Sequence, residues 1–123
     1  MSGLEYDTSQ KGLNTVLRDW QIKVLQIVWS SPQGVKSSEA HQRVKTMLGE
    51  ETISRASVIN FLQAMRNLGV LSSVDTTGKG GHHAIYHPKL DERGFKAYIA
   101  EKLLISLSEN FPEETRLTLK KLN

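Results

Sequence analysis

The sequence predicts a mainly α-helical protein that carries one small β-hairpin. Three observations lead to this fold class. Apolar residues recur at helical spacing along most of the chain. Residues 70–88 instead hold two strand-like runs around a glycine-rich centre, a pattern typical of a hairpin. The length of 123 residues, of which 38% are hydrophobic, is enough for one main core but not for two independent ones.

The first expected helix covers Asp19 to Trp29, although its start can lie as early as Asn14 or Thr15. Its apolar side chains share one face and are Trp20, Val24, Ile27 and Val28. We expect the helix to end near residue 30, because Pro32 disfavours a helical conformation at the preceding residue and Gly34 favours a turn.

The second expected helix covers Glu39 to Leu48 and is capped by Ser37 or Ser38. Its expected inward-facing residues are Ala40, Val44, Met47 and Leu48. Gly49 ends this helix, and residues 49–53 form the linker to the next one.

The third expected helix begins after Ser54, whose hydroxyl can accept a hydrogen bond from an unpaired backbone N–H of the first turn. Its apolar stripe consists of Val58, Phe61, Leu62, Met65 and Leu68, and Gly69 suits a left-handed residue at the helix end. The opposite face carries Arg55, Ser57, Asn60 and Gln63. Such side chains can approach base edges or phosphates without a long apolar group holding the helix away from a groove. An ordinary amphipathic surface helix has the same stripe, so the next segment decides the interpretation.

Two strand-like runs follow directly, from Val70 to Asp75 and from Ala84 to Pro88, and we expect a loop at residues 76–83 between them. A hairpin placed after a recognition helix is the wing of a winged helix-turn-helix fold. Lys79 at its tip can then contact phosphate or enter a minor groove. The alternative for the tip is a loose solvated turn.

Beyond the hairpin the sequence predicts two more helices. The first is capped by Asp91 and runs from Glu92 to Glu109, and the second begins at Pro112. The apolar residues expected to form a homodimer are Phe95, Tyr98, Ile99, Leu103, Leu104, Leu107 and Leu117. The winged core is already closed by its own helices and hairpin, so this surface needs a partner, and most soluble oligomers are two-fold symmetric. In the alternative, these helices fold back on their own core.

The expected organisation is a flexible tail at residues 1–13, a winged helix-turn-helix DNA-binding domain at residues 14–90 and a helical dimerisation region at residues 91–123. The net charge of +3 lies entirely in residues 1–90, since the remainder carries equal numbers of acidic and basic side chains. Phosphate contacts supply most of the non-specific affinity for DNA, so a domain this weakly basic should need a second copy to bind well.

Several classes of function are excluded or disfavoured. The chain has no cysteine, which excludes disulfides, thiolate metal sites and cysteine nucleophiles. It has neither a glycine-flanked nucleophilic serine nor a phosphate-binding loop motif, so we expect a protein that is not an enzyme and uses no cofactor. No apolar run reaches bilayer length and the N-terminus lacks the plan of a secretory signal, which predicts a cytoplasmic protein without a membrane segment.

Histidines near the wing raise the question of a metal site. His82, His83 and His87 are close in sequence, and strand alternation puts His83 and His87 on one face, where imidazoles can bind zinc or nickel. No carboxylate or cysteine stands beside them, so we expect no metal and interpret them as wing residues that can hydrogen-bond to phosphate. A metal-responsive regulator is the alternative. His41, on a separate helix, adds no ligand to this group.

Five strings carry a resemblance to a known family: residues 19–22 (DWQI), 28–29 (VW), 54–58 (SRASV), 68–71 (LGVL) and 84–88 (AIYHP). From about Leu17 to Leu122 the chain resembles penicillinase-repressor-type winged-helix transcriptional regulators and, more distantly, multiple-antibiotic-resistance repressors. The resemblance implies that polar residues of the third helix read the major groove, that the wing touches the DNA backbone and that the C-terminal helices form the dimer. The matching positions are Ser54, Arg55, Ala56, Ser57, Asn60 and Gln63, with Lys79 on the wing.

The sequence therefore predicts a homodimeric regulator that binds double-stranded DNA sequence-specifically, and in particular a repressor that recognises an inverted repeat. The alternative is a winged-helix module that binds proteins and does not read DNA. Some members of the family are inactivated by cleavage of an Asn-Phe bond, and Asn110-Phe111 stands at a similar place, but the tail that follows is short and we do not predict cleavage. The operator, the target genes and the effector are not specified by the sequence.

Overall fold

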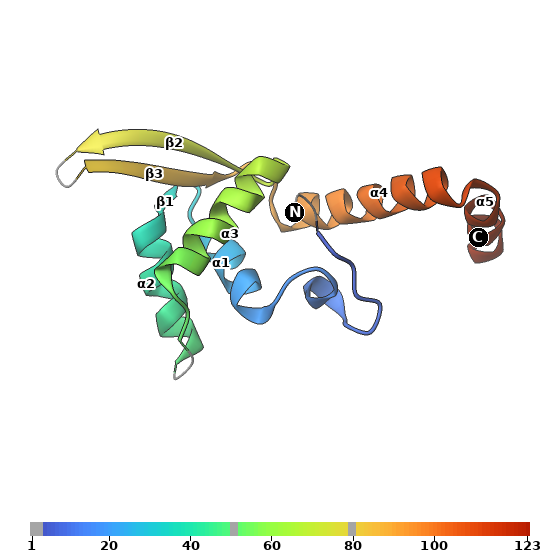
Figure 1. Ribbon diagram of the computed structural model, residues 1–123, viewed down its shortest axis with the longest axis horizontal. Helices are drawn as coiled ribbons and strands as arrows, with labels where there is room; N and C mark the ends of the chain where they lie inside the picture. Colours follow the sequence, from blue (N-terminus) through green and yellow to red (C-terminus); the bar gives the residue numbers. More distant parts are fainter. Residues whose placement is uncertain (1–3, 50–51, 79–80) are drawn as a thin grey trace. The chain divides into compact units, whose positions relative to one another are not determined.

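A computed structural model describes residues 4–49, 52–78 and 81–123, which fall into two compact units, Met1–Glu92 and Arg93–Asn123 (Figure 1). The first unit contains the short 3-10 helix η1 (Gly12–Thr15), helices α1 (Asp19–Trp29), α2 (Ser37–Leu48) and α3 (Arg55–Leu68), and strands β1 (Val35–Lys36), β2 (Leu71–Gly78) and β3 (Gly81–Pro88). Helix α4 (Glu92–Asn110) begins at the junction, and α5 (Pro112–Leu122) follows it. The predicted fold class, mainly α with a small β-hairpin, is confirmed.

The strands form one antiparallel sheet in the order β1-β3-β2, with β1 paired to β3 through Val35 and Tyr86. Helices α1, α2 and α3 lie on the same side of the hairpin in Figure 1. This order of helices, with a short strand and a terminal hairpin, is the winged helix-turn-helix arrangement. The predicted loop at residues 76–83 is too long, because pairing of β2 with β3 continues out to Gly78 and Gly81 and adds those residues to the ladder.

The core of the first unit lies between the helices and the sheet. Its fully buried large side chains include Leu25, Leu62, Leu71 and Tyr86. The rings of Trp20 and Phe61 meet edge-on at a centroid distance of 5.6 Å and join α1 to α3. Burial of one such apolar side chain contributes about 1.5–3 kcal/mol, so the predicted stripe of α3 anchors that helix firmly. Within that stripe Val58, Phe61, Leu62 and Met65 are buried, whereas Leu68 is half-buried.

Three details of α1 and α2 differ from what the sequence predicts. Helix α1 begins at Asp19, and Asn14 and Thr15 belong to the separate η1 turn. Neither Ser37 nor Ser38 caps α2, because its N-cap is Lys36, which lies in β1 and has an extended backbone. The strand therefore passes directly into the helix. The expectation that Met47 faces inward is also wrong, since its side chain is 46% exposed, while Ala40 and Val44 are buried as predicted.

The segment before α1 is held by local hydrogen bonds. The backbone N–H of Asp7 donates to the carbonyl of Thr15 over 2.7 Å, and Asn14 Nδ2 donates to Asp19 Oδ1 over 2.8 Å. The hydroxyl and backbone N–H of Ser9 donate to the Asp7 carboxylate, which lowers the pKa of that carboxyl below its usual value. The flexibility expected for residues 1–13 stays a prediction.

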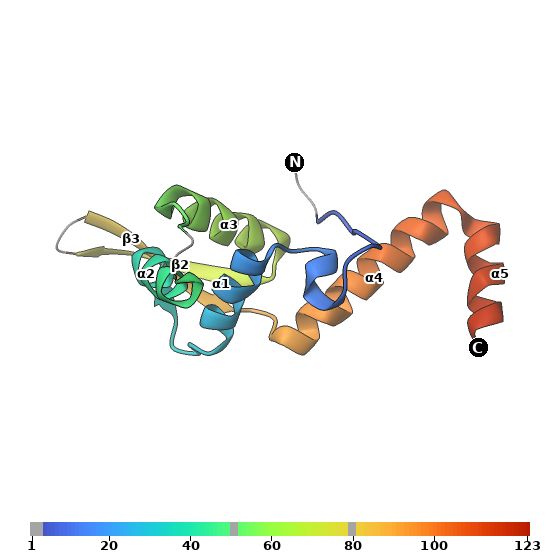
Figure 2. The same cartoon turned by 90° about the horizontal axis from the view of Figure 1, so that it is seen from below.

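The second unit is built around the junction of α4 and α5, where the chain turns sharply (Figure 2). The hydroxyl of Thr115 donates to the carbonyl of Leu107 over 2.9 Å, and Asn110 Nδ2 donates to the carbonyl of Ser106 over 2.8 Å. Pro112 stands in the first turn of α5, as predicted, where its missing N–H has no helical partner to lose. In the described part of the chain, no helix combines the length and the apolar character needed to cross a membrane.

Candidate nucleic-acid interface

The start of α3 is fixed by its predicted cap. The backbone N–H of Ser57 donates to Ser54 Oγ over 3.0 Å, and Ser54 has the extended backbone of an N-cap residue, with φ −74° and ψ 151°. The hydroxyl oxygens of the two serines are also hydrogen-bonded, 2.8 Å apart. Both hydroxyls thus hold the first turn together, and they keep only part of their hydrogen-bonding capacity for a ligand.

A contact that the sequence analysis missed joins α2 to the start of α3. The imidazole Nε2 of His41 lies 2.9 Å from the carbonyl oxygen of Ile53, the residue before the cap. A carbonyl oxygen can only accept, so Nε2 carries the proton and donates. His41 is therefore a positioning residue for α3. No local signal could reveal this contact, because Ile53 is 12 residues away, in the linker that precedes α3.

The exposed side of α3 is a polar stripe. We define this reading stripe as Ala56, Asn60, Gln63 and Asn67, all exposed and spaced four, three and four residues apart. Such spacing stacks side chains on one face of a helix, opposite the buried residues. Arg55 is exposed beside the stripe, and Ser57 is half-buried. The predicted residues on α3 are thus brought together on its accessible side, and the stripe extends to Asn67, which the sequence analysis did not include.

The end of α3 sets the start of the wing. Gly69 has a left-handed backbone with φ 85°, and the following N–H, that of Val70, donates to the carbonyl of Met65. Arg66 Nη1 then donates to Ser73 Oγ of β2 over 3.3 Å. Together these bonds tie the last turn of α3 to the first strand of the hairpin. The end of the reading stripe is thus connected to the base of the wing.

The base of the wing is packed closely against the turn before β1. Gly34 has φ +97°, and a Cβ atom added there would lie 2.6 Å from His87 Cε1 and 2.6 Å from Ile85 Cγ2. The neighbouring Tyr86 is fully buried, and burial raises the pKa of its hydroxyl above 10.0. Trp29 Nε1 donates to the carbonyl of Leu90 over 2.9 Å and fixes the chain where it leaves the hairpin.

Some of the predicted wing residues lie outside the described part of the structure. Lys79 is one of them, and the side chains of His82 and His83 are others. His87 is half-buried, with its ring over Gly34. Within residues 4–49, 52–78 and 81–123, no three His, Cys, Asp or Glu side chains gather in a way that suits a metal ion.

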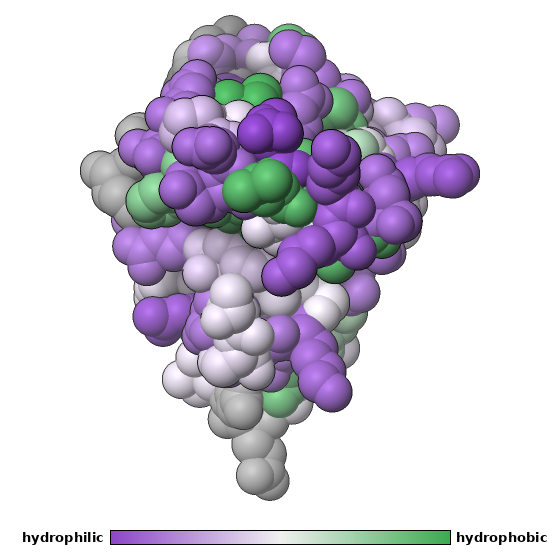
Figure 3. Space-filling view, turned by 90° about the vertical axis from the view of Figure 1, so that its right-hand side faces the viewer, coloured by the Kyte–Doolittle hydropathy of each residue, from purple (hydrophilic) through white to green (hydrophobic). Residues whose placement is uncertain are grey.

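The residues predicted to form a dimer differ in their exposure. Phe95 is fully buried and its ring stacks with Tyr98 at a centroid distance of 6.5 Å. Leu104 and Leu117 are 43% and 50% exposed. The half-buried members are Tyr98, Ile99, Leu103 and Leu107, and the exposed apolar residues that the sequence analysis did not assign to the dimer are Ile105, Phe111, Leu119 and Leu122. Figure 3, which faces α5, shows hydrophobic residues lying among hydrophilic ones on this surface.

No model of a protein family matches this chain, and no curated protein sequence matches it. Among solved structures, the chain is similar to the ferric uptake regulator (Fur) of Vibrio cholerae, a protein with DNA-binding domains, with 20% sequence identity and a TM-score of 0.46. The match covers 64% of this chain and 57% of that one, so the matched region spans little more than half of the length of Fur. The winged-helix assignment rests on the element order and strand register described above.

Proposed function

We propose that this chain is a homodimeric transcriptional regulator that binds double-stranded DNA sequence-specifically and represses from an inverted-repeat operator. The observation that carries the proposal is the reading stripe of α3. Its side chains are exposed and are either small, as in alanine, or polar, as in asparagine and glutamine, while the opposite face of the same helix is buried in the core. A helix that exposes only such side chains on one face can enter the major groove of B-DNA.

The chemistry of the stripe suits base readout. The amide side chains of Asn60 and Gln63 each offer a donor and an acceptor, the pattern that pairs with the N6 and N7 atoms of adenine. Ala56 leaves room for close approach of the helix to the groove. Arg55, at the first helical position, can reach a phosphate or the edge of a guanine.

The homodimer and the wing complete the proposal. The positive net charge of +3 is small for a protein that binds a polyanion, so paired domains are needed for useful affinity. Two reading stripes related by a two-fold axis would contact half-sites whose centres lie about 10 base pairs apart, or a small multiple of that. The resemblance to penicillinase-repressor-type regulators supports both the repressor assignment and a backbone contact by Lys79 on the wing.

The test begins with selection of bound duplexes from a random pool, which we expect to yield a palindrome. Fluorescence anisotropy on the selected duplex then compares Asn60→Ala and Arg55→Ala with wild type. Loss of a base contact costs about 1–3 kcal/mol, so each variant should bind roughly 5- to 150-fold more weakly. Gln26→Ala is the matched control, because it removes an exposed side-chain amide from α1, outside the reading stripe, and should bind the duplex as wild type does.

Lys79→Ala tests the wing. It should weaken binding to all duplexes by a similar factor and reduce the slope of log affinity against log salt by about 1. Unchanged affinity in both Asn60→Ala and Arg55→Ala would overturn the assignment of α3 as the reading helix. A wild-type chain that shows no salt-dependent duplex binding and co-purifies with another polypeptide would instead be a protein-interaction module.

A further inference from the structure

Helix α5 buries none of its leucines. Within this helix, which the structure describes from Pro112 to Leu122, Thr115 is the one buried residue, while Leu117, Leu119 and Leu122 are exposed. An isolated helix of 11 residues is only marginally stable in water, and helices in proteins gain most of their stability by packing an apolar face. A partner that covers the apolar side of α5 would therefore stabilise this end of the chain.

Most of the apolar side chains in this region gather where α5 faces α4. A groove of about 340 Å³ lies between the two helices. We define the groove face as the apolar residues that line it, which are Leu104, Leu107, Phe111, Leu119 and Leu122. All of them are exposed except Leu107, which is half-buried. The groove face thus joins α4, the junction and α5 in one apolar surface.

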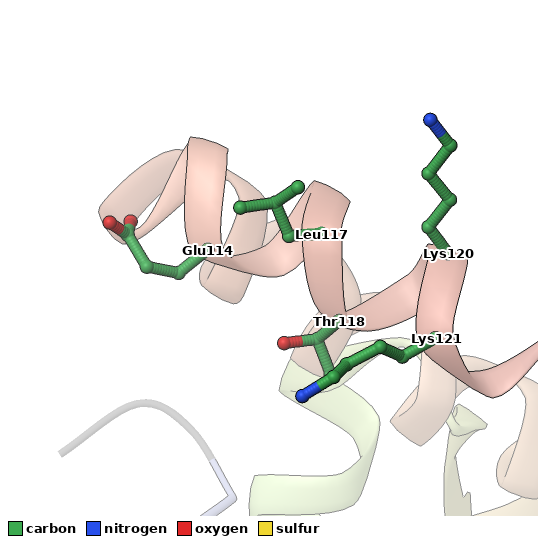
Figure 4. A pocket seen from close by; sticks show the side chains of 5 residues that line it. All are labelled: Glu114, Leu117, Thr118, Lys120 and Lys121. Atoms are coloured by element: carbon green, nitrogen blue, oxygen red, sulfur yellow. The ribbon is translucent and has the colours of Figure 1, made fainter.

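The opposite side of α5 has a different character. Leu117 is two residues from Leu119, and such a spacing turns side chains to nearly opposite sides of a helix. Figure 4 shows Leu117 among the charged side chains of Glu114, Lys120 and Lys121. Covering that side would remove water from three charged groups and bury a single leucine in return. The groove face is the side of α5 that gains most from a partner.

We infer that the groove face packs against the groove face of a second copy of this chain, around a two-fold axis, and that Leu117 stays in solvent. This inference rests on the homodimer of the proposed function and names the surface that forms it. A two-fold contact uses the same patch on both copies, so one groove face must supply half of the interface.

The exposed area is close to what a dimer needs. A standard interface buries about 800 Å² on each partner, of which about 65% is apolar in homodimers. Four residues of the groove face leave on the order of 400 Å² of apolar surface open to solvent. Their exposed fractions are 43% for Leu104, 58% for Phe111, 42% for Leu119 and 77% for Leu122.

The extent and charge of this region also favour a second copy. The apolar surface continues along α4, where Ala97 and Ala100 are exposed two turns and one turn before Leu104. A surface that extends over two helices suits a macromolecule better than a small ligand, which is held in an enclosed pocket. Residues 91–123 carry equal numbers of acidic and basic side chains, so two copies can meet here without net repulsion.

The experiment measures self-association of the full chain by sedimentation equilibrium, and we expect the wild type to dimerise. Leu119→Glu places a charge inside the apolar contact and should raise the dimer dissociation constant on the order of a hundredfold. Leu122→Glu should raise it about tenfold or more. Leu122 is 77% exposed within one chain, so its replacement should leave the fold intact, which circular dichroism checks.

The matched control is Leu117→Glu. It makes the same exchange on the same helix at a position of similar exposure, 50% against 42% for Leu119. Both variants change the net charge and the helix propensity equally, so they differ in the face that carries the charge. Leu117→Glu should leave the dissociation constant within about threefold of wild type.

A monomeric wild type would overturn the inference, and so would a dimer that Leu117→Glu weakens as much as Leu119→Glu does. A dimer that all three variants leave unchanged, and that binds the selected duplex, would remove the groove contact and keep the proposed function. A dimer weakened by Leu119→Glu and Leu122→Glu but not by Leu117→Glu, in a protein that binds no duplex, would keep the groove contact and overturn the proposed function.

Discussion

The Nε2 atom of His41 and the carbonyl oxygen of Ile53 lie 2.9 Å apart and join α2 to the residue that precedes the cap of α3. This bond links the two helices of the helix-turn-helix at the point where the reading stripe begins. The His41 bond holds α3 from the neighbouring helix α2, and the Ser54 cap holds the first turn of α3 itself. The orientation of α3 is therefore set at its N-terminal end, where base contacts are proposed.

Replacing His41 with alanine should lower the free energy of unfolding by about 1 kcal/mol, because the part-buried carbonyl of Ile53 loses its donor. Urea denaturation at a fixed protomer concentration measures the change. The exposed neighbour Gln42 provides the control, since Gln42→Ala should shift stability by less than about 0.5 kcal/mol. Equal stability of the two variants would contradict a structural role for the imidazole.

Substitutions at Ser54 separate helix capping from DNA binding. Ser54→Ala should cost about 1 kcal/mol of stability, because the N–H of Ser57 loses its acceptor. Ser54→Asp keeps an acceptor at the cap and should stay close to wild type in stability. Its negative charge should nevertheless weaken duplex binding through repulsion of phosphate, as measured by anisotropy. If the aspartate variant unfolds as easily as the alanine variant, capping is not the role of this residue.

Gly34 is expected to be intolerant of any side chain. Gly34→Ala should destabilise the protein by about 2–4 kcal/mol, since it combines a left-handed backbone with a Cβ only 2.6 Å from His87 Cε1 and Ile85 Cγ2. Gly49 is the matched control, because it also has positive φ, +68°, but no atom within 4 Å of its added Cβ. Gly49→Ala should cost only about 1 kcal/mol in thermal or urea unfolding. Comparable losses would show that the clash at Gly34 is relieved by small movements.

Stability should fall at high pH because of Tyr86. Burial raises the pKa of its hydroxyl above 10.0 in the folded state, with Asp75 adding to the shift and Arg66 opposing it. The stability that the buried, protonated Tyr86 hydroxyl contributes is fully present below the unfolded pKa of about 10. It is lost as pH rises through the folded pKa, because the hydroxyl ionises more readily in the unfolded chain.

Urea denaturation between about pH 8 and 11 measures this effect. Tyr86→Phe should lose less stability over that range than wild type does. The exposed Tyr6 supplies the control, since Tyr6→Phe should follow the wild-type curve. A wild-type curve parallel to that of Tyr86→Phe would refute the assignment.

Features with local causes could be predicted from the sequence. The cap at Ser54, the buried stripe and the left-handed Gly69 lie within one helix and its ends, so their pattern is visible in consecutive residues. The hairpin was also predictable, although its strands are longer than expected, because strand pairing continues through residues of weak strand preference once a register is set. The approximate end of α4 and the start of α5 at Pro112 follow from the same local signals.

Features with distant causes could not be predicted. Strand β1 is two residues long and exists through its pairing with Tyr86 and Ile85, about fifty residues away. That pairing holds Lys36 extended and makes it the N-cap of α2, which overrides the capping preference of the serines that follow. The contact of His41 with Ile53 depends in the same way on how two helices meet. Sequence patterns identify which face of a helix is polar, but tertiary packing decides which residues hold it in place.

The crowding around Gly34 limits how this protein can change over evolutionary time. Trimming the imidazole at position 87 would not make room, because the methyl group of Ile85 blocks the same space from another direction. A side chain at position 34 would need two compensating replacements on β3 and a residue that tolerates positive φ, all acquired together. Single mutations cannot readily reach that combination. We therefore expect Gly34 and the β3 residues that contact it, Ile85 and His87, to change together or not at all.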